Sequence, residues 1–443
     1  MTGKPDQKIF WAGLMASGLV LGLVSAKLGP VEVVANRNET NSSEKEENQG
    51  GEQTTREVTV AKVAESGTGI KLMSADDWAE KFPDEYNSFQ LNAENKDTVD
   101  YLQEYPYLKD LYKGYGFAKS YSSARGHTYV IDDLYNTGRP HKLANCFTCK
   151  TSEYTNYVLN NGDQAYAMKF EDYADLYTGT DPFGCFHCHE NEPGTLYVTH
   201  GYVAAGMGDD LSKVDGATLS CAQCHTEYYF DPSTSATSVA YHGLDKMGPD
   251  AELEYENSLT DKDGNLFCDW VDEDTGTRKL KVQHPEFETF VSGSIHYMQG
   301  LTCADCHMSK KTDDSGKTYT SHDWVSPLKD ESIMTGTCAK CHGSDTEALK
   351  KQVKSIQENT IKQQNELADK IVKLDADLAA AISANKISGE DLEKCRMAYR
   401  NAQWYWDYVF VENSDGFHNN QLTSHCFEKC ESYLKEANSY LGA

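Results

Sequence analysis

Residues 146–150 read Cys-Phe-Thr-Cys-Lys, and four further stretches of the chain repeat this spacing with histidine in the last place. These are residues 185–189, 221–225, 303–307 and 338–342. In Cys-x-x-Cys-His the two thiols bind a porphyrin covalently and the adjacent imidazole ligates its iron, so the pattern is typical of haem c. Because an amine replaces the imidazole at Lys150, the sequence predicts four ordinary haem groups and one unusual group, numbered in chain order.

Structural zinc also uses Cys-x-x-Cys pairs, but its pairs must meet in fours and need no histidine directly after the second cysteine. With 14 Cys and 14 His in 443 residues, chance predicts about 0.01 copies of Cys-x-x-Cys-His, and the chain holds four. The predicted haem-binding cysteines are Cys146, Cys149, Cys185, Cys188, Cys221, Cys224, Cys303, Cys306, Cys338 and Cys341. The predicted proximal iron ligands are Lys150, His189, His225, His307 and His342.

The composition is that of an acidic globular protein. The length of 443 residues suffices for one large domain and an appendage. The hydrophobic fraction of 39%, together with 33 glycines, lies near the ordinary globular range. The formal net charge of −28 argues against nucleic acid and against anionic lipid as partners.

The N-terminus carries an export signal. An apolar run over residues 9–26 follows two lysines, which is typical of a signal peptide or a membrane anchor in residues 1–26. Small residues before position 27 would suit cleavage, whereas an uncleaved run is nearly long enough to span a bilayer. Both alternatives place the body outside the cytoplasm, in the periplasm or on the outer face of the membrane, where disulfides can persist.

The rest of the chain divides by composition. Residues 27–66, rich in Glu, Asn, Ser and Gly, predict a flexible polar linker. In residues 67–343, short pieces separated by haem motifs and Gly, Asp and Asn turns predict a mainly α pentahaem catalytic domain with little sheet. Bound haems would themselves supply part of its apolar core.

Residues 344–443 predict a region of long helices. Ser344 and Asp345 can cap the first helix, whose apolar residues recur at steps of three and four over roughly ten turns. A second helix begins at Ser388-Gly-Glu-Asp, and a third follows Asn419. Elongated helices with exposed apolar seams favour a subunit interface, so we expect a homodimer.

Electron-transfer haems usually have a second strong axial ligand, so four Cys-x-x-Cys-His haems need four more histidines. Ten histidines lie outside the proximal positions, and composition does not choose among them. They are His127, His141, His187, His200, His242, His284, His296, His322, His418 and His425.

From about Tyr101 to its C-terminus the chain resembles the ammonia-forming cytochrome c nitrite reductases. Besides the lysine motif, the resemblance rests on Arg125-Gly-His127, Cys221-Ala-Gln-Cys-His225-Thr-Glu227-Tyr228-Tyr-Phe, Lys281-Val-Gln283-His284-Pro-Glu and Ala402-Gln-Trp404-Tyr-Trp406-Asp. It implies that the distal ligands of the second to fifth haems are His322, His127, His418 and His296, in that order. The resemblance assigns no ligand role to five of the others, which we expect to be ordinary surface or core residues: His141, His187, His200, His242 and His425.

The resemblance also implies the reduction of nitrite to ammonium with six electrons, supplied through four bis-histidine haems. A haem whose sole protein ligand is Lys150 has one face open to substrate, and hydroxylamine or sulfite could use the same pocket. With Lys150, the residues expected to be catalytic are Arg139, Tyr228 and His284. The expected electron donor is a membrane-bound, quinol-oxidising multihaem cytochrome. The alternative functions are a non-catalytic electron carrier and a zinc-bound interaction protein.

The active-site arginine departs from the family's pattern. In the stretch Leu134-Tyr-Asn136-Thr137-Gly138-Arg139-Pro140, Asn136 occupies the aligned place, and the loop to the lysine motif is shorter. Arg139 would deliver the same charge from a shifted position. Arg125 is the alternative, although its place beside His127 suggests a propionate or backbone partner.

A calcium site is also implied by the resemblance. Its predicted ligands are the side chains of Glu227 and Gln283 and the carbonyls of Tyr228 and Lys281, and such hard oxygen donors suit calcium.

Four cysteines, Cys268, Cys395, Cys426 and Cys430, belong to no haem motif. A disulfide from Cys395 to Cys426 or Cys430 is one alternative, and free buried thiols are the other.

Overall fold

The computed structural model describes residues 58–67 and 69–442. The predicted signal or anchor segment and residues 27–57 of the predicted linker lie outside the described residues. Residues 58–66 are folded: strand β1 (Lys62–Val63) pairs in parallel with β2 (Tyr197–Val198), and Ala61 and Ala64 are buried. The ordered body therefore begins several residues before the predicted boundary at residue 67.

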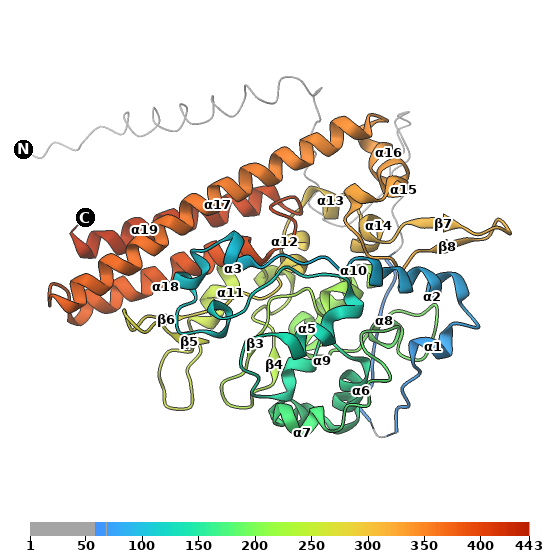
Figure 1. Ribbon diagram of the computed structural model, residues 1–443, viewed down its shortest axis with the longest axis horizontal. Coiled ribbons are helices and arrows are strands. Elements are labelled where there is room, and N and C mark those ends of the chain that lie inside the picture. Colours follow the sequence, from blue (N-terminus) through green and yellow to red (C-terminus); the bar gives the residue numbers. More distant parts are fainter. Residues whose placement is uncertain (1–57, 68, 443) are drawn as a thin grey trace, which may run out of the picture. The chain divides into compact units, whose positions relative to one another are not determined.

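The body consists of short helices joined by turns (Figure 1), as the spacing of glycines and haem motifs predicts. Its helices are α1 (Ala75–Trp78), α2 (Pro83–Gln90), α3 (Tyr101–Glu104), α4 (Leu108–Leu111), α5 (Val130–Asn136), α6 (Ser152–Asn161), α7 (Phe170–Ala174), α8 (Phe186–His189), α9 (Gly201–Met207), α10 (Gly216–Ala222), α11 (Pro249–Glu256), α12 (Glu286–Val291), α13 (Ile295–Met298), α14 (Cys303–His307), α15 (Glu331–Ile333) and α16 (Ala339–His342).

Strands are few and short in the described residues. Besides β1 and β2 they form three antiparallel pairs. The pairs are β3 (Tyr229–Phe230) with β4 (Thr237–Ser238), β5 (Trp270–Val271) with β6 (Arg278–Lys279), and β7 (Lys310–Thr312) with β8 (Thr318–Thr320). The prediction of a mainly α fold with little sheet is thus confirmed.

Three long helices follow the body, as predicted: α17 (Thr346–Ser383), α18 (Gly389–Val411) and α19 (Asn420–Leu441). They lie side by side in Figure 1. The side chain of Asp345 accepts the backbone N–H of Ala348 at 3.0 Å and so caps α17, while Asn419 accepts the N–H of Leu422 at 3.1 Å and caps α19.

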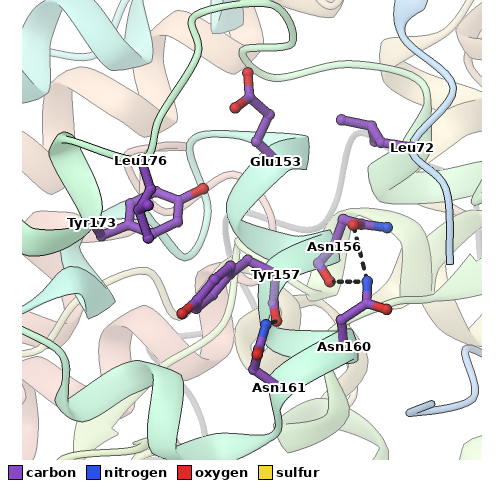
Figure 2. A pocket seen from close by; sticks show the side chains of 8 residues that line it. All are labelled: Leu72, Glu153, Asn156, Tyr157, Asn160, Asn161, Tyr173 and Leu176. Carbon is purple, nitrogen blue, oxygen red and sulfur yellow. Dashed lines mark hydrogen bonds between the residues drawn. The ribbon is translucent and has the colours of Figure 1, made fainter. Parts of the chain in front are cut away.

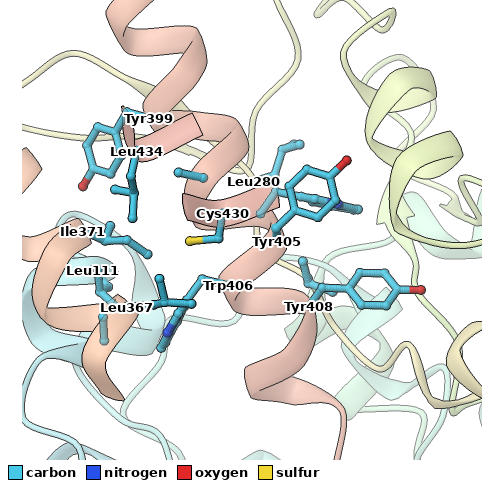
Figure 3. Close-up of a cluster of buried hydrophobic side chains, with 14 of the residues drawn as sticks. Leu111, Leu280, Leu367, Ile371, Tyr399, Tyr405, Trp406, Tyr408, Cys430 and Leu434 are labelled. Atoms are coloured by element: carbon cyan, nitrogen blue, oxygen red, sulfur yellow. The ribbon is translucent and has the colours of Figure 1, made fainter. Parts of the chain in front are cut away.

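The largest apolar core joins these helices to the body. Leu367 and Ile371 of α17 pack with Trp406 of α18 and Leu434 of α19, and body residues such as Leu280 belong to the same cluster (Figure 3). The indole N–H of Trp406 donates to the carbonyl of Gln364 in α17 at 2.9 Å. The segment from Ala402 to Asp407 is therefore buried between the helices and the body.

Within the described ranges, no helix combines the length and the apolar character that crossing a membrane would require.

Candidate active site

The lysine motif lies on a tight turn between two anchored segments. Phe147 is fully buried and stacks on Phe170, with ring centres 4.8 Å apart. After the motif, the hydroxyl of Thr151 accepts the N–H of Glu153 at 3.2 Å and begins α6. The backbone N–H of Lys150 donates to the carbonyl of Phe147 at 2.9 Å. The motif's cysteines and its lysine therefore have a defined position.

Tyr228 and Arg139 converge on this motif. Tyr228 lies close enough to Cys146, Cys149 and Arg139 for their charges to act on its phenol. Burial raises the pKa of Tyr228 far above its usual range, against the opposing charge of Arg139. The phenol is therefore a protonated hydrogen-bond donor at any physiological pH. The structure thus brings together two of the predicted catalytic residues beside the predicted catalytic haem site.

Arg139 is held without a carboxylate. Its Nε donates to the hydroxyl of Thr137 at 3.2 Å, and its guanidinium lies 4.3 Å from the ring centre of Phe117. Among residues 58–67 and 69–442 it forms no ion pair with an acid. Arg125, the alternative, donates to Asp133 through Nε at 3.0 Å and Nη2 at 2.6 Å. The geometry favours Arg139 as the charge available to an anion.

His284, the third predicted catalytic residue, lies beside the third motif. Its ring centre is 6.0 Å from that of His225, and the Glu286 carboxylate lies between the two rings, 3.5 Å from Nδ1 of His225 and 3.9 Å from Nδ1 of His284. Burial works against the charge of Glu286, but the two imidazoles hold its pKa well below the usual range. Glu286 thus acts electrostatically on both rings, while Nδ1 of His284 has no hydrogen-bond partner among the described residues. We call the three residues that are predicted to surround the substrate, Arg139, Tyr228 and His284, the distal pocket.

The four predicted calcium ligands also lie together. The Glu227 side chain accepts the N–H of Gln283 at 2.5 Å, and Nε2 of Gln283 donates to the Lys281 carbonyl at 3.1 Å. The other carboxylate oxygen of Glu227 is buried and has no hydrogen-bond partner among the described residues. Burial and the nearby Glu256 raise the pKa of Glu227 well above its usual range, so its ionised form needs a positive partner. This donor set fits calcium.

Each predicted distal histidine faces the proximal histidine of the haem assigned to it. The ring centres lie 6.1 to 6.3 Å apart in the pairs His127–His225, His189–His322, His307–His418 and His296–His342. Two metal–imidazole bonds of about 2 Å each and the half-widths of two rings add up to about this separation. The residues present therefore fit four irons held between paired imidazoles.

Several of these histidines have an acceptor at one ring nitrogen, which would leave the other nitrogen for metal. Nδ1 of His189 lies 2.8 Å from the Thr195 carbonyl, and Nδ1 of His322 lies 2.9 Å from that of Thr320. Burial lowers the pKa of His127 to about 3 and that of His307 to about 4, so both rings are neutral, as a ligand must be.

Contacts between cysteines place the motifs in order. Cys149 of the first motif and Cys224 of the third lie with His200 in a group whose ligand atoms are within 4.8 Å of one another. Cys221 of the third motif contacts Cys303 of the fourth. Each of these thiols would be bound to a haem. The haem of the third motif would therefore lie between the haem of the lysine motif and that of the fourth motif.

A family model described as cytochrome c552 matches residues 74–442 of this sequence. The chain belongs to the cytochrome c552 family.

Relatives within this family include a protein named as a nitrite reductase. The cytochrome c nitrite reductase subunit NrfA of Nitratidesulfovibrio vulgaris is 33% identical over 390 residues, which cover 76% of this chain and 72% of that protein. Cytochrome c-552 of Desulfotalea psychrophila is 32% identical over 374 residues, covering 79% and 71%. The structure of cytochrome c nitrite reductase from Desulfovibrio desulfuricans, described with two calcium sites in its catalytic subunit, superposes with a TM-score of 0.73 at 29% identity, over 84% of this chain and 87% of that one. The resemblance to the cytochrome c nitrite reductase family is confirmed.

The histidines without a predicted role have protein partners in this chain. Nε2 of His200 lies 2.9 Å from the Thr148 carbonyl, and Nδ1 of His187 lies 3.1 Å from the Ser152 hydroxyl. His141 stacks on Phe170, and the His242 ring contacts that of Tyr255 at a tilt, with ring centres 4.5 Å apart. His425 bonds to Asp250 at 3.0 Å.

The four cysteines outside the haem motifs form no disulfide among the described residues. Cys395, Cys426 and Cys430 are buried, and Sγ of Cys395 donates to the Ala437 carbonyl at 3.5 Å. Cys268 is partly exposed. Of the two alternatives that the sequence left open, the structure has the buried free thiols.

Sequence reasoning missed the acids that hold the histidines. Glu286 lies inside a motif that carries the resemblance, yet nothing in the motif shows that its carboxylate reaches His225. Glu412 is six residues from His418, and its carboxylate lies 2.5 Å from that ring's Nδ1. The sequence does show an acid within a few residues of a histidine. That arrangement is too common in proteins to predict a hydrogen bond between the two.

A surface cavity of about 240 Å³ lies on α6, away from these residues (Figure 2). Its polar side chains already hold neighbouring loops. Glu153 accepts the N–H groups of Thr178 and Thr180, each at 2.9 Å, and Asn160 accepts that of Gly69 at 2.8 Å. We assign this cavity no ligand.

Asp181, buried between the first two motifs, predicts a pH dependence of stability. Burial raises its pKa to about 6 from 3.8. Since the folded state holds the proton more tightly than the unfolded chain, Asp181 lowers stability as the pH rises from about 4 to about 6. In Asp181→Asn this loss should vanish. Between about pH 4 and pH 7, the free energy of unfolding of the variant should rise relative to that of the parent protein by up to about 3 kcal/mol. Denaturant titrations of both proteins measure it, and parallel pH profiles would contradict the assignment.

Proposed function

We propose that this cytochrome reduces nitrite to ammonium at a haem c whose iron is held by Lys150. The overall reaction consumes nitrite, six electrons and eight protons and yields ammonium and two waters. The observation that carries the proposal is that Arg139 and Tyr228 both lie near the cysteines of the lysine motif. A chain that only carried electrons would have no need of a cation and a phenol there.

Five haem c groups on the five motifs would supply a store of electrons, and the group held by Lys150 would supply an iron to which an anion can bind. The four facing pairs of imidazoles support a purely electron-transferring role for the other four groups. The lysine nitrogen has to be deprotonated to act as a ligand, which the charge of the metal makes feasible.

The distal pocket handles the charge and the protons. Arg139 binds the oxygens of the anion and stabilises negative charge as an N–O bond breaks. Tyr228 remains protonated, because burial raises its pKa, and donates a hydrogen bond to the same oxygens. His284, whose Nδ1 lies 3.9 Å from the Glu286 carboxylate, delivers protons to the substrate.

Calcium at Glu227, Tyr228, Lys281 and Gln283 would add positive potential behind Tyr228. The formal charge of the chain is −28, so an anionic substrate needs local positive charge in order to enter. The unpartnered, buried oxygen of Glu227 supports the site.

Three further proposals follow from the family and the sequence. The electron donor is a membrane-bound, quinol-oxidising multihaem cytochrome, the chain works outside the cytoplasm, and two copies associate through the C-terminal helices. Hydroxylamine and sulfite, which also offer a lone pair to iron, are secondary substrates of the same pocket.

A non-catalytic electron carrier is the second candidate function. The presence of Arg139 and Tyr228 near the lysine motif speaks against it.

The reaction itself is the first test. The purified holoprotein, reduced with methyl viologen, should consume six electrons for each nitrite and release one ammonium. A haem stain and a pyridine haemochrome titration should give five haems per chain. Viologen that stays reduced when nitrite is added, in a preparation with all five haems, would leave only the electron-carrier function.

Arg139→Ala should lower kcat/KM for nitrite by about 10²- to 10³-fold, the cost of removing a charged donor from an anion-stabilising site. Arg125→Ala is the matched control, because its guanidinium is already paired with Asp133, and it should retain most activity. Steady-state kinetics of both variants at equal haem content decides between the two arginines. An equal loss in both, or a loss in Arg125→Ala alone, would reject Arg139.

Calcium should stabilise the folded protein through Glu227. At calcium concentrations about 100 times the dissociation constant, binding should add about 2.7 kcal/mol to the free energy of unfolding. Glu227→Gln should abolish this gain, whereas Glu254→Gln, an exposed control on α11, should keep it. Thermal unfolding with calcium and with a chelator measures the effect. A gain that persists undiminished in Glu227→Gln would place calcium elsewhere.

A further inference from the structure

The segment that carries Gln283 and His284 is held by its own backbone. Three successive N–H groups donate to three carboxylates: Lys281 to Asp269 at 2.7 Å, Val282 to Asp407 at 3.0 Å, and Gln283 to Glu227 at 2.5 Å. Hydrogen bonds to charged acceptors are stronger than those to neutral ones. Since this stretch lies outside the described strands, these acids replace a neighbouring strand.

Asp407 is the acid that comes from the C-terminal helices. It lies on α18, is fully buried, and closes the Ala402–Asp407 stretch, to which the proposed reaction assigns no role. Besides the Val282 N–H, it receives the hydroxyl of Tyr112 and the ammonium of Lys281, the latter at 3.1 Å to both carboxylate oxygens. The same carboxylate therefore binds the segment through its backbone and through a side chain.

The pair Asp407–Lys281 also reaches the arginine of the distal pocket. The Lys281 ammonium lies 5.1 Å from the ring centre of Phe117 and 5.0 Å from that of Tyr112. Phe117 is the ring on which the Arg139 guanidinium lies. A shift of Lys281 would therefore disturb the aromatic wall that holds Arg139, as well as the segment that holds His284.

We propose that Asp407 is a positioning residue of the active site: from α18 it fixes segment 281–284 and, through Lys281 and Phe117, the wall behind Arg139. This inference rests on the nitrite reductase function proposed above. It gives the Trp-Tyr-Trp-Asp end of the α18 stretch a catalytic purpose besides packing. The C-terminal helices then contribute directly to the geometry of the pocket.

A second buried pair provides a matched comparison. Lys279 lies two residues before Lys281, and its ammonium is 2.9 Å from Asp272, with both side chains fully buried. It too lies over aromatic rings, those of Trp270 and Tyr399. Asp272, however, accepts N–H groups within its own turn, from Asp274 and Thr275, and none from segment 281–284. Loss of either acid leaves one buried ammonium unpaired, so both cost stability for the same reason.

Asp407→Asn and Asp272→Asn separate positioning from stability. Both variants should be less stable than the parent protein. Only Asp407→Asn should lower kcat for nitrite, by about 10- to 100-fold, as loss of a supporting hydrogen bond does. Hydrogen exchange of peptides covering residues 281–288 should speed up in Asp407→Asn and remain as in the parent in Asp272→Asn. Equal kinetic losses in the two variants, or unchanged exchange in Asp407→Asn, would overturn the proposal.

Two further arms keep the outcome decisive. If Asp407→Asn does not yield folded holoprotein, Lys281→Met/Asp407→Asn removes the unpaired ammonium, with Lys279→Met/Asp272→Asn as its control. The same difference in exchange is then expected, and a Lys281→Met/Asp407→Asn protein that still does not fold would make Asp407 a residue of stability alone. If the parent protein itself does not reduce nitrite, the proposed function fails, while the exchange measurement still decides the role of Asp407.

Discussion

Twelve successive residues of α18, from Ala398 to Val409, are buried, and each polar side chain among them must find a partner inside the protein. Arg400 donates to the carbonyls of Phe267 and Arg278, and Gln403 donates to that of Leu111. The partners belong to separate parts of the body: Leu111 ends α4, and Phe267 and Arg278 lie more than 150 residues later in the chain, before and within β6. Removing α18 would therefore leave buried polar groups unpaired in each of these parts. The long helices are thus part of the structure that holds the proposed site.

The second constraint is buried negative charge. Glu227, Glu252, Glu256 and Glu288 are almost fully buried, and each has one carboxylate oxygen without a hydrogen-bond partner among the described residues. Burial raises the pKa of all four. Such a group stays neutral or requires a nearby cation. Arg400 supplies one positive charge beside Glu256, and the proposed calcium at Glu227 would supply another, so the same ion would serve stability and the attraction of an anion.

The sequence predicts what is local. The five motifs, the cap at Asp345 and the three long helices depend on residues within a turn or two of each other, and the structure has this cap and these helices where they were expected. The arginine required a comparison with the family, and its environment became visible only with the fold, which places Phe117 under it. Contacts between distant segments could not be predicted, because nothing near Asp407 in sequence indicates that its carboxylate reaches Val282, 125 residues away.

The contrast between the two arginines shows how an acidic protein can keep a charge available for an anion. Arg125 forms a bidentate ion pair with Asp133. Because the carboxylate neutralises the guanidinium, Arg125 attracts a further anion only weakly. Arg139 is oriented by a hydroxyl and an aromatic ring, which fix its position and leave its charge uncompensated. The chain has 69 acidic and 41 basic residues. The charge of Arg139 therefore stays available to an anion only if the side chains that surround its guanidinium are uncharged. Phe117 and Tyr228 provide this uncharged wall, and the charges that stabilise it, those of Lys281 and Asp407, lie buried and paired with each other.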